Sequence, residues 1–515
     1  VIIKEYKYFV QKIILVGITN ILVSLSPLIL LPILSKNLGV QEYGVWNQFT
    51  VTLTLIPAIA ALGLPYTLVR FFSASRNLDE IKEAFYTIAT LIILGCGSIA
   101  ILFLVFSGFI SDILFSGNTF VTLILALTLF ISGLILLSFD YFRTFDQMRT
   151  YSIFSFSQAF LTVLIVALFI FNGSDISGAV LGMLITQIII FLGMYVLIIK
   201  QIGFTAPKFY NIKEYLNFGL PTIPSNISFW ILDITDRYLI GILLSLSFVG
   251  YYSAGYLLGS IISILLSPFY TILLPILAQY HVDNEVFKIK SLLNHSIKFF
   301  LVVAIPSVFI LTILSKPILT ILSTPSIAEN GYIITPIVAI GGLFFGVYGI
   351  ISQIIVLERK TKITGNIWLF SIFINVLMDI VFGFYWGIVG IAMTTLIVYL
   401  FAMLLTIYYS FKFIRCNFYF GFLSKTIISS IVISLILIII YPTEPLKIIL
   451  SILASFIVYL IILWALRGIK MSEIILFKEV FQDIFMMIFK PLPKKNLRKK
   501  LSKFRKYKDK EKNGG

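Results

Sequence analysis

Long apolar runs alternate with short polar loops along almost the whole chain. About 20 apolar residues are needed for a helix to cross roughly 30 Å of hydrocarbon, and backbone groups in lipid must bond to one another, so each run is predicted to be a transmembrane helix. Fourteen such runs occur, at residues 13–34, 44–69, 85–106, 120–138, 152–171, 180–199, 218–240, 251–277, 299–314, 332–357, 366–385, 391–409, 426–441 and 448–466. The pattern therefore predicts an all-α integral membrane protein.

Basic residues separate the loops of this predicted topology into two sets. All but four of the 39 Lys and Arg residues lie on the side of the N-terminus or in the C-terminal tail, and the four exceptions are Lys36, Arg237, Lys316 and Lys447. Cytoplasmic loops carry the excess of Lys and Arg. Both termini are therefore predicted to be cytoplasmic, in a multi-pass protein of the cytoplasmic membrane.

Composition agrees with the membrane class and narrows the functions. The chain is 59% hydrophobic and only 12% charged, whereas a soluble domain is about one quarter charged. The net charge of +16 does not indicate nucleic-acid binding, because the excess is concentrated after Arg467, in a predicted interfacial helix and polybasic tail that suit an anionic lipid surface. Two cysteines provide neither a disulfide framework nor a metal site, and no cofactor is expected.

Five short segments of the first half recur in the second half in the same order. One match aligns Gly44 with Gly250, and another aligns ISGAVLGM at 176–183 with WGIVGIAM at 386–393. The repeat contains six spans, an even number, so its copies should be related by an axis along the membrane normal. We expect two parallel six-helix bundles, residues 1–205 and 206–412, then two additional helices in 413–466 and the interfacial helix and tail in 467–515.

Four segments also carry a resemblance to a known family. They are LSKNLGVQEYGVW (34–46), LGLPYTLVRFFS (62–73), FGLPTIPSNISFWILDITDRYLI (218–240) and VGYYSAGYLL (249–258). With the plan of six, six and two spans, they resemble the multidrug/oligosaccharidyl-lipid/polysaccharide exporter superfamily, and they are similar to its polysaccharide-biosynthesis branch, the Wzx-type O-antigen flippases. The resemblance covers nearly the whole chain.

This resemblance implies a flippase that moves a polyprenyl-diphosphate-linked oligosaccharide from the cytoplasmic to the outer leaflet. The unit carried would be an O-antigen, capsule or other surface polysaccharide unit, and polysaccharide-assembly proteins are implied as partners. Such transport needs alternating access but no covalent catalysis, so an enzyme is not expected. A cation-coupled multidrug or small-molecule antiporter of the same superfamily and a flippase for the peptidoglycan lipid precursor remain the alternatives.

Ionisable residues inside predicted spans are costly and mark candidate functional sites. Asp233, Asp236 and Arg237 lie in the seventh span, and Asp379 lies in the eleventh. Because Asp233 and Arg237 are four residues apart, they share a helix face and can form a pair that is only structural. The functional alternative is a set of cavity charges that meets the diphosphate, a cation or the gate.

The repeat helps to weigh these readings. Asp236, Arg237 and Asp379 align with Leu30, Leu31 and Leu168 of the first copy, which is expected to fold without charges at these places. Asp379 is therefore a candidate for coupling to Na⁺ or a proton. A neutral Asp379 bonded to a neighbouring helix is the alternative.

Three further polar residues complete the candidate set for substrate. Arg70 and Arg143 end the second and fourth spans, either as anchors at the membrane surface or as groups at the cavity mouth that grip a diphosphate. Asn226 lies within the seventh span, where an amide joins helices or lines the sugar path. Trp46, Tyr251 and Tyr252, by contrast, are predicted to belong to the aromatic belt at the outer interface rather than to bind sugar.

Overall fold

The computed structural model describes residues 2–72, 77–417 and 420–468, and every element within them is a helix. The predicted interfacial helix and basic tail lie outside the described residues. The first half contains α1 (Ile2–Ala60), α2 (Leu64–Phe72), α3 (Leu78–Val105), α4 (Ser107–Leu114), α5 (Thr119–Thr144), α6 (Met148–Phe171) and α7 (Ile176–Ile202). The remainder contains α8 (Ile212–Gly219), α9 (Thr222–Leu243), α10 (Leu246–Gly259), α11 (Ile261–Ile264), α12 (Ser267–Val282), α13 (Val286–Leu322), α14 (Pro325–Gly331), α15 (Ile334–Leu357), α16 (Thr361–Ser410), α17 (Phe420–Ile440) and α18 (Pro445–Ala465).

Among the described residues, eleven helices are long and apolar enough to cross a membrane. Two of these, Leu15–Ala60 and Thr361–Ser410, have 46 and 50 residues, which is about 70 Å of helix and more than twice the hydrocarbon thickness. Each is broken at a glycine, Gly39 with φ 82° and Gly387 with φ 58°, a region that glycine enters without a steric penalty. Both breaks fall between predicted spans. The total of fourteen crossings stays a prediction.

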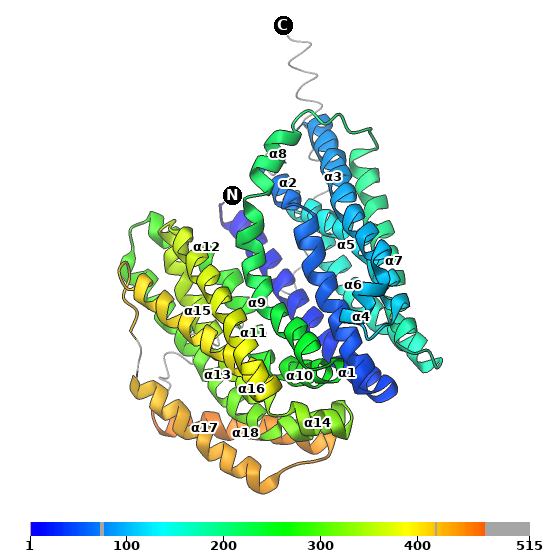
Figure 1. Ribbon diagram of the computed structural model, residues 1–515. Helices are drawn as coiled ribbons and strands as arrows, with labels where there is room; N and C mark the ends of the chain where they lie inside the picture. The colour runs from blue at the N-terminus through cyan, green and yellow to red at the C-terminus, as the bar shows by residue number, and fades with distance from the viewer. Residues whose placement is uncertain (1, 73–76, 418–419, 469–515) are drawn as a thin grey trace.

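The helices form two bundles, as expected. In Figure 1, α1 to α7 run from blue to cyan on one side, and α9 to α16 run from green to yellow on the other. The two additional helices α17 and α18 lie along the second bundle, where Ile433 and Tyr459 share a buried cluster with Leu314 of α13. The all-α two-bundle prediction is confirmed, whereas the exact domain boundaries stay a prediction.

The buried clusters show that the bundles share one core at one end and have separate cores toward the other. One cluster contains residues from both bundles, including Leu31 and Phe49 of α1 and Tyr252 of α10. Two further clusters each belong to one bundle, one around Phe85 and the other around Leu293. We call the end around the common cluster the joined end and the opposite one the parted end. In Figure 1 the joined end, with α10 and α14, is below, and the parted end, with α2, α8 and α12, is above.

Glycine permits the closest approach of the bundles at the joined end. A Cβ atom added to Gly44 would lie 1.9 Å from the Leu246 carbonyl oxygen, and one added to Gly250 would lie 2.5 Å from the Val40 carbonyl oxygen. The alignment of Gly44 with Gly250 also aligns Val40 with Leu246. Exchanging the two copies therefore converts one contact into the other. This is the relation that a two-fold axis between self-complementary surfaces produces.

Candidate functional site

A cavity of about 670 Å³ lies between the two bundles. Its volume is in the usual range of ligand sites, roughly 300–1,000 Å³. The wall from the first bundle is uncharged and combines apolar residues such as Val51 and Met183 with polar ones. The polar side chains from α1 and α6 include Asn47, Thr50, Thr54, Ser155, Gln158 and Thr162. The opposite wall comes from α9 and α10, and its Arg237 is the one charged residue among the described lining residues.

Aromatic rings hold Arg237 at this wall. Its guanidinium carbon lies 4.3 Å from the centre of the Tyr256 ring and 5.8 Å from that of Tyr252. Tyr43 of α1, another lining residue, is close enough for the Arg237 charge to act on its hydroxyl group. A cation over an aromatic face gains about 0.5–2 kcal/mol, and arginine stays charged under all ordinary conditions. The arrangement presents a permanent, positioned cation to the space between the bundles.

Asp236, the residue before Arg237, is turned into the second bundle and is fully buried. It accepts hydrogen bonds from the Tyr252 hydroxyl group and from Oγ1 of Thr395, the latter at 2.9 Å. Asp379 of α16 is also fully buried, and the charged and polar groups that act on its carboxylate are Asp236 and Thr394. We call Asp236 and Asp379 the acidic pair.

The surroundings of the acidic pair suit a small cation or a proton. Both carboxylate oxygens of Asp379 and both amide atoms of Asn375, one helical turn earlier, are enclosed without a hydrogen bond of normal geometry. Two neighbouring carboxylates buried in a medium of low dielectric constant cannot both remain ionised unless a positive charge offsets them. Oxygen atoms are the donors that hard cations prefer. The acidic pair with Asn375 and Thr395 therefore provides a chemically suitable set of donors.

Arg70 and Arg143 are not among the described residues that line the cavity. Arg70 is exposed at the end of α2. Arg143 is 46% exposed and forms an ion pair with Asp140 at 3.1 Å, with its guanidinium also 5.3 Å from the Tyr151 ring. The side chains of Asp233 and Asn226 lie outside the described residues, so their predicted roles, including the Asp233–Arg237 pair, stay predictions.

The belt assignment of Trp46 and Tyr252 was wrong. Trp46 is 6% exposed and Tyr252 is fully buried, because α1 and α10 pack directly against each other at the joined end. The repeat contained the missed signal, since the alignment of Gly44 with Gly250 also aligns Trp46 with Tyr252. Trp46 and Tyr252 each lie two residues after a glycine of the contact between the copies, so both are expected in the common core.

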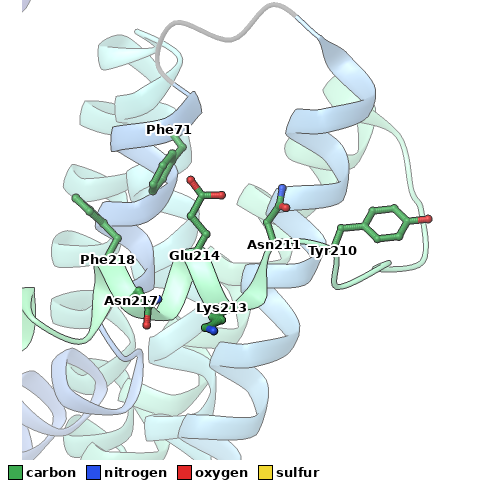
Figure 2. A pocket seen from close by; sticks show the side chains of 7 residues that line it. All are labelled: Phe71, Tyr210, Asn211, Lys213, Glu214, Asn217 and Phe218. Atoms are coloured by element: carbon green, nitrogen blue, oxygen red, sulfur yellow. The ribbon is translucent and has the colours of Figure 1, made fainter.

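A second pocket, of about 540 Å³, lies at the parted end between α2 and α8 (Figure 2). Phe71 of α2 packs against Phe218, with ring centres 5.5 Å apart, and against Tyr215 at 6.2 Å. Burial raises the pKa of Tyr215, which keeps its hydroxyl group neutral. The pocket shares no lining residue with the cavity between the bundles, and its aromatic contacts dock the segment that links the two copies onto the first bundle.

Comparisons with known proteins agree with this architecture. The model of a family described as polysaccharide biosynthesis protein matches residues 9–281, and one described as MatE matches residues 221–381. A protein of the Lsg locus of Haemophilus influenzae is 24% identical over 55% of this chain and 69% of its own length. A Haloferax volcanii protein named as the probable low-salt glycan biosynthesis flippase Agl15 is 21% identical over 44% of this chain and 48% of its own length.

Solved structures show the same fold. The lipid II flippase MurJ in an inward closed conformation superposes with a TM-score of 0.70 at 18% identity, covering 88% of this chain and 98% of that one. An inward-facing multidrug resistance transporter of the MATE family superposes with a TM-score of 0.62 at 13% identity, covering 78% and 97%. The arrangement of two bundles is therefore that of known transporters.

Proposed function

The chain belongs to the polysaccharide biosynthesis protein family, whose model matches residues 9–281, and from this premise we propose that it is a flippase for a polyprenyl-diphosphate-linked oligosaccharide. The observation that carries the proposal is the asymmetric cavity between the bundles. It combines an uncharged wall of hydroxyl and amide groups with one positioned guanidinium. These are the two chemistries that a sugar and a diphosphate require.

The two walls divide the work of recognition. Asn47, Thr50 and Gln158 each donate one hydrogen bond within the protein. Their oxygen atoms and the second amide N–H groups of Asn47 and Gln158 can replace the water around sugar hydroxyl groups. Arg237 faces them and grips a phosphate through paired, charge-assisted hydrogen bonds. The polyprenyl chain stays in the hydrocarbon of the bilayer throughout. The proposal needs no bond to be made or broken in the substrate.

The joined and parted ends indicate how access alternates. The structure corresponds to one state of the cycle, in which the bundles are closed against each other around Gly44 and Gly250. Rocking of one copy against the other around a site between them would part this contact and close the opposite end. With both termini in the cytoplasm, as the distribution of Lys and Arg predicts, the joined end is the outer one.

The acidic pair is the proposed coupling site. A sodium ion or a proton held by Asp236, Asp379 and Asn375 would neutralise the buried charge and make one state of the second bundle more stable than the other. The extent to which cation binding drives transport equals its difference in affinity between the two states. This part of the proposal extends the candidate role of Asp379.

Reconstitution tests the proposed function. The purified chain is placed in vesicles that contain a fluorescent polyprenyl-diphosphate oligosaccharide, and an impermeant quencher reports the label remaining outside. We expect the protein to accelerate exchange of the oligosaccharide lipid between leaflets. Sugar-free polyprenyl diphosphate should move more slowly, because it leaves the uncharged wall without partners.

Protein-free vesicles and export of a cationic dye complete the test. If the protein exports the dye but leaves the oligosaccharide lipid in its original leaflet, the chain is an antiporter and the proposal is wrong. If it moves the sugar-free lipid as fast as the complete one, the role given to the uncharged wall is wrong.

A further inference from the structure

Tyr252 contacts both of the charged features of the second bundle. Its hydroxyl group donates a hydrogen bond to Oδ2 of Asp236, and its ring centre lies 5.8 Å from the guanidinium carbon of Arg237. The same ring lies 5.7 Å from that of Tyr256, which is the closer aromatic neighbour of Arg237. One fully buried side chain thus lies between the acidic pair and the cation of the cavity.

Asp236 and Arg237 are successive residues of α9 and therefore point about 100° apart around the helix axis. Asp236 is turned toward Thr395 and Asp379 in the second bundle, and Arg237 is turned toward the cavity. The negative charge of an ionised acidic pair attracts the guanidinium and competes with a phosphate for it. A cation bound at the pair cancels this attraction, so the phosphate meets a less compensated positive charge.

We infer that Tyr252 is a positioning residue that couples the charge state of the acidic pair to the phosphate affinity of Arg237. Its hydrogen bond fixes the Asp236 carboxylate and its own ring, and the ring in turn packs against the guanidinium. Cation binding and diphosphate binding then strengthen each other. Thermodynamic linkage requires each to change the affinity of the other by the same factor.

The inference rests on the proposed function, and the test separates the two. Isothermal titration calorimetry measures the binding of farnesyl diphosphate to the full chain in detergent, in sodium chloride and in choline chloride of equal ionic strength. We expect sodium to tighten binding by about fivefold or more in the unmodified protein, a usual size for coupling between sites.

The decisive variant is Tyr252→Phe, which keeps the ring over Arg237 and removes the hydrogen bond to Asp236. Its affinity for farnesyl diphosphate in choline chloride is its own baseline, and the ratio of its affinities in sodium chloride and choline chloride should fall close to one. Tyr238→Phe is the matched control, because it also removes a tyrosine hydroxyl group. This hydroxyl group belongs to the neighbouring helix α9 and is hydrogen-bonded to Thr52 at 2.7 Å rather than to the acidic pair. This control should keep the full effect of the cation.

A cation effect that survives in Tyr252→Phe overturns the inference and leaves the proposed function intact. Absence of any cation effect in the unmodified protein overturns the inference as well. Failure of the unmodified protein to bind farnesyl diphosphate in every buffer counts against the proposed function itself. A loss of the cation effect in both tyrosine variants shows that it depends on general packing, which also overturns the role of Tyr252.

Discussion

The two bundles follow one plan, but the charges placed inside the membrane belong to the second. The cavity wall from α1 and α6 is uncharged, whereas α9 supplies Arg237 and, behind it, Asp236. At the corresponding places the first copy has Leu31 and Leu30. A six-helix bundle of this design therefore forms without these charges, and burial of an acid is itself unfavourable. The comparison supports the proposal that the charges of the second bundle serve transport, because the first copy folds with leucine at the same places.

The largest effect is expected when the cavity residue Arg237 of the second bundle is replaced with leucine, the residue at the corresponding place in the first bundle. In Arg237→Leu, the flipping rate of the oligosaccharide lipid should fall by about 10- to 100-fold, since a hydrogen bond to a charged group contributes about 1.5–3 kcal/mol. Vesicle flipping assays at matched protein levels measure the rate. Arg143→Leu is the control, because Arg143 lies outside the cavity lining, and it should change the rate much less. Equal losses in the two variants would contradict the account.

The reciprocal contact of the joined end can be broken from either copy. In Gly44→Ala the added Cβ atom meets a backbone carbonyl group, and such overpacking costs about 1–3 kcal/mol. The closed state should lose about 5- to 100-fold in population, and Gly250→Ala should do the same. Spin labels on the exposed residues Asn37 and Glu329 report the separation at this end, which should increase. Gly365→Ala is the control, because an added Cβ atom there has no neighbour within 4 Å.

The sequence predicted the plan better than the contacts. The lengths of the apolar runs and the repeat predicted two bundles and two further helices, because hydrocarbon thickness and duplication leave direct marks on a sequence. The energetic cost of charges in lipid also identified Asp236, Arg237 and Asp379. Periodicity does not say which helices face one another, so the contact of Tyr252 with both Asp236 and Arg237 became visible only in the structure.

The acidic pair can also be removed by substituting the residue found in the first copy. Asp379→Leu introduces the amino acid that the first copy has at the corresponding place, Leu168. The thermal stability in choline chloride should be unchanged or raised, because Asp236 loses a buried neighbour of like charge. The stabilisation that sodium gives to the unmodified protein through binding of the folded state should disappear. Melting of the detergent-purified chain in the two salts measures both effects. A variant that melts far lower in choline chloride would instead assign a structural role to Asp379.

A smaller effect is expected for the ion pair of the first bundle. Asp140→Asn removes the partner of Arg143 at a side chain that is 46% exposed and that also contacts Tyr151, so the loss of stability should stay below about 1 kcal/mol. Thermal melting and the flipping assay both report it. A strong loss of flipping at normal stability would extend the functional charges to the first bundle and break the comparison.

The orientation of the two ends can be read without disturbing function. Both native cysteines are buried, and burial raises the pKa of Cys416 to about 11, so it holds little reactive thiolate at neutral pH. Cysteines introduced at the exposed residues Glu329 and Arg359 should then dominate labelling by an impermeant maleimide. In intact cells Glu329→Cys should react and Arg359→Cys should not. The reverse result would show that the chain has the opposite orientation in the membrane and would contradict the predicted topology.

A structure of the full chain in lipid nanodiscs with a polyprenyl-diphosphate oligosaccharide tests the central claim most directly. The account predicts phosphate oxygens about 2.7–2.9 Å from the Arg237 guanidinium, as in charge-assisted hydrogen bonds. It also predicts sugar density along the wall that contains Asn47 and Gln158. Phosphates bound at Arg70 or Arg143, with no substrate density between the bundles, would contradict it.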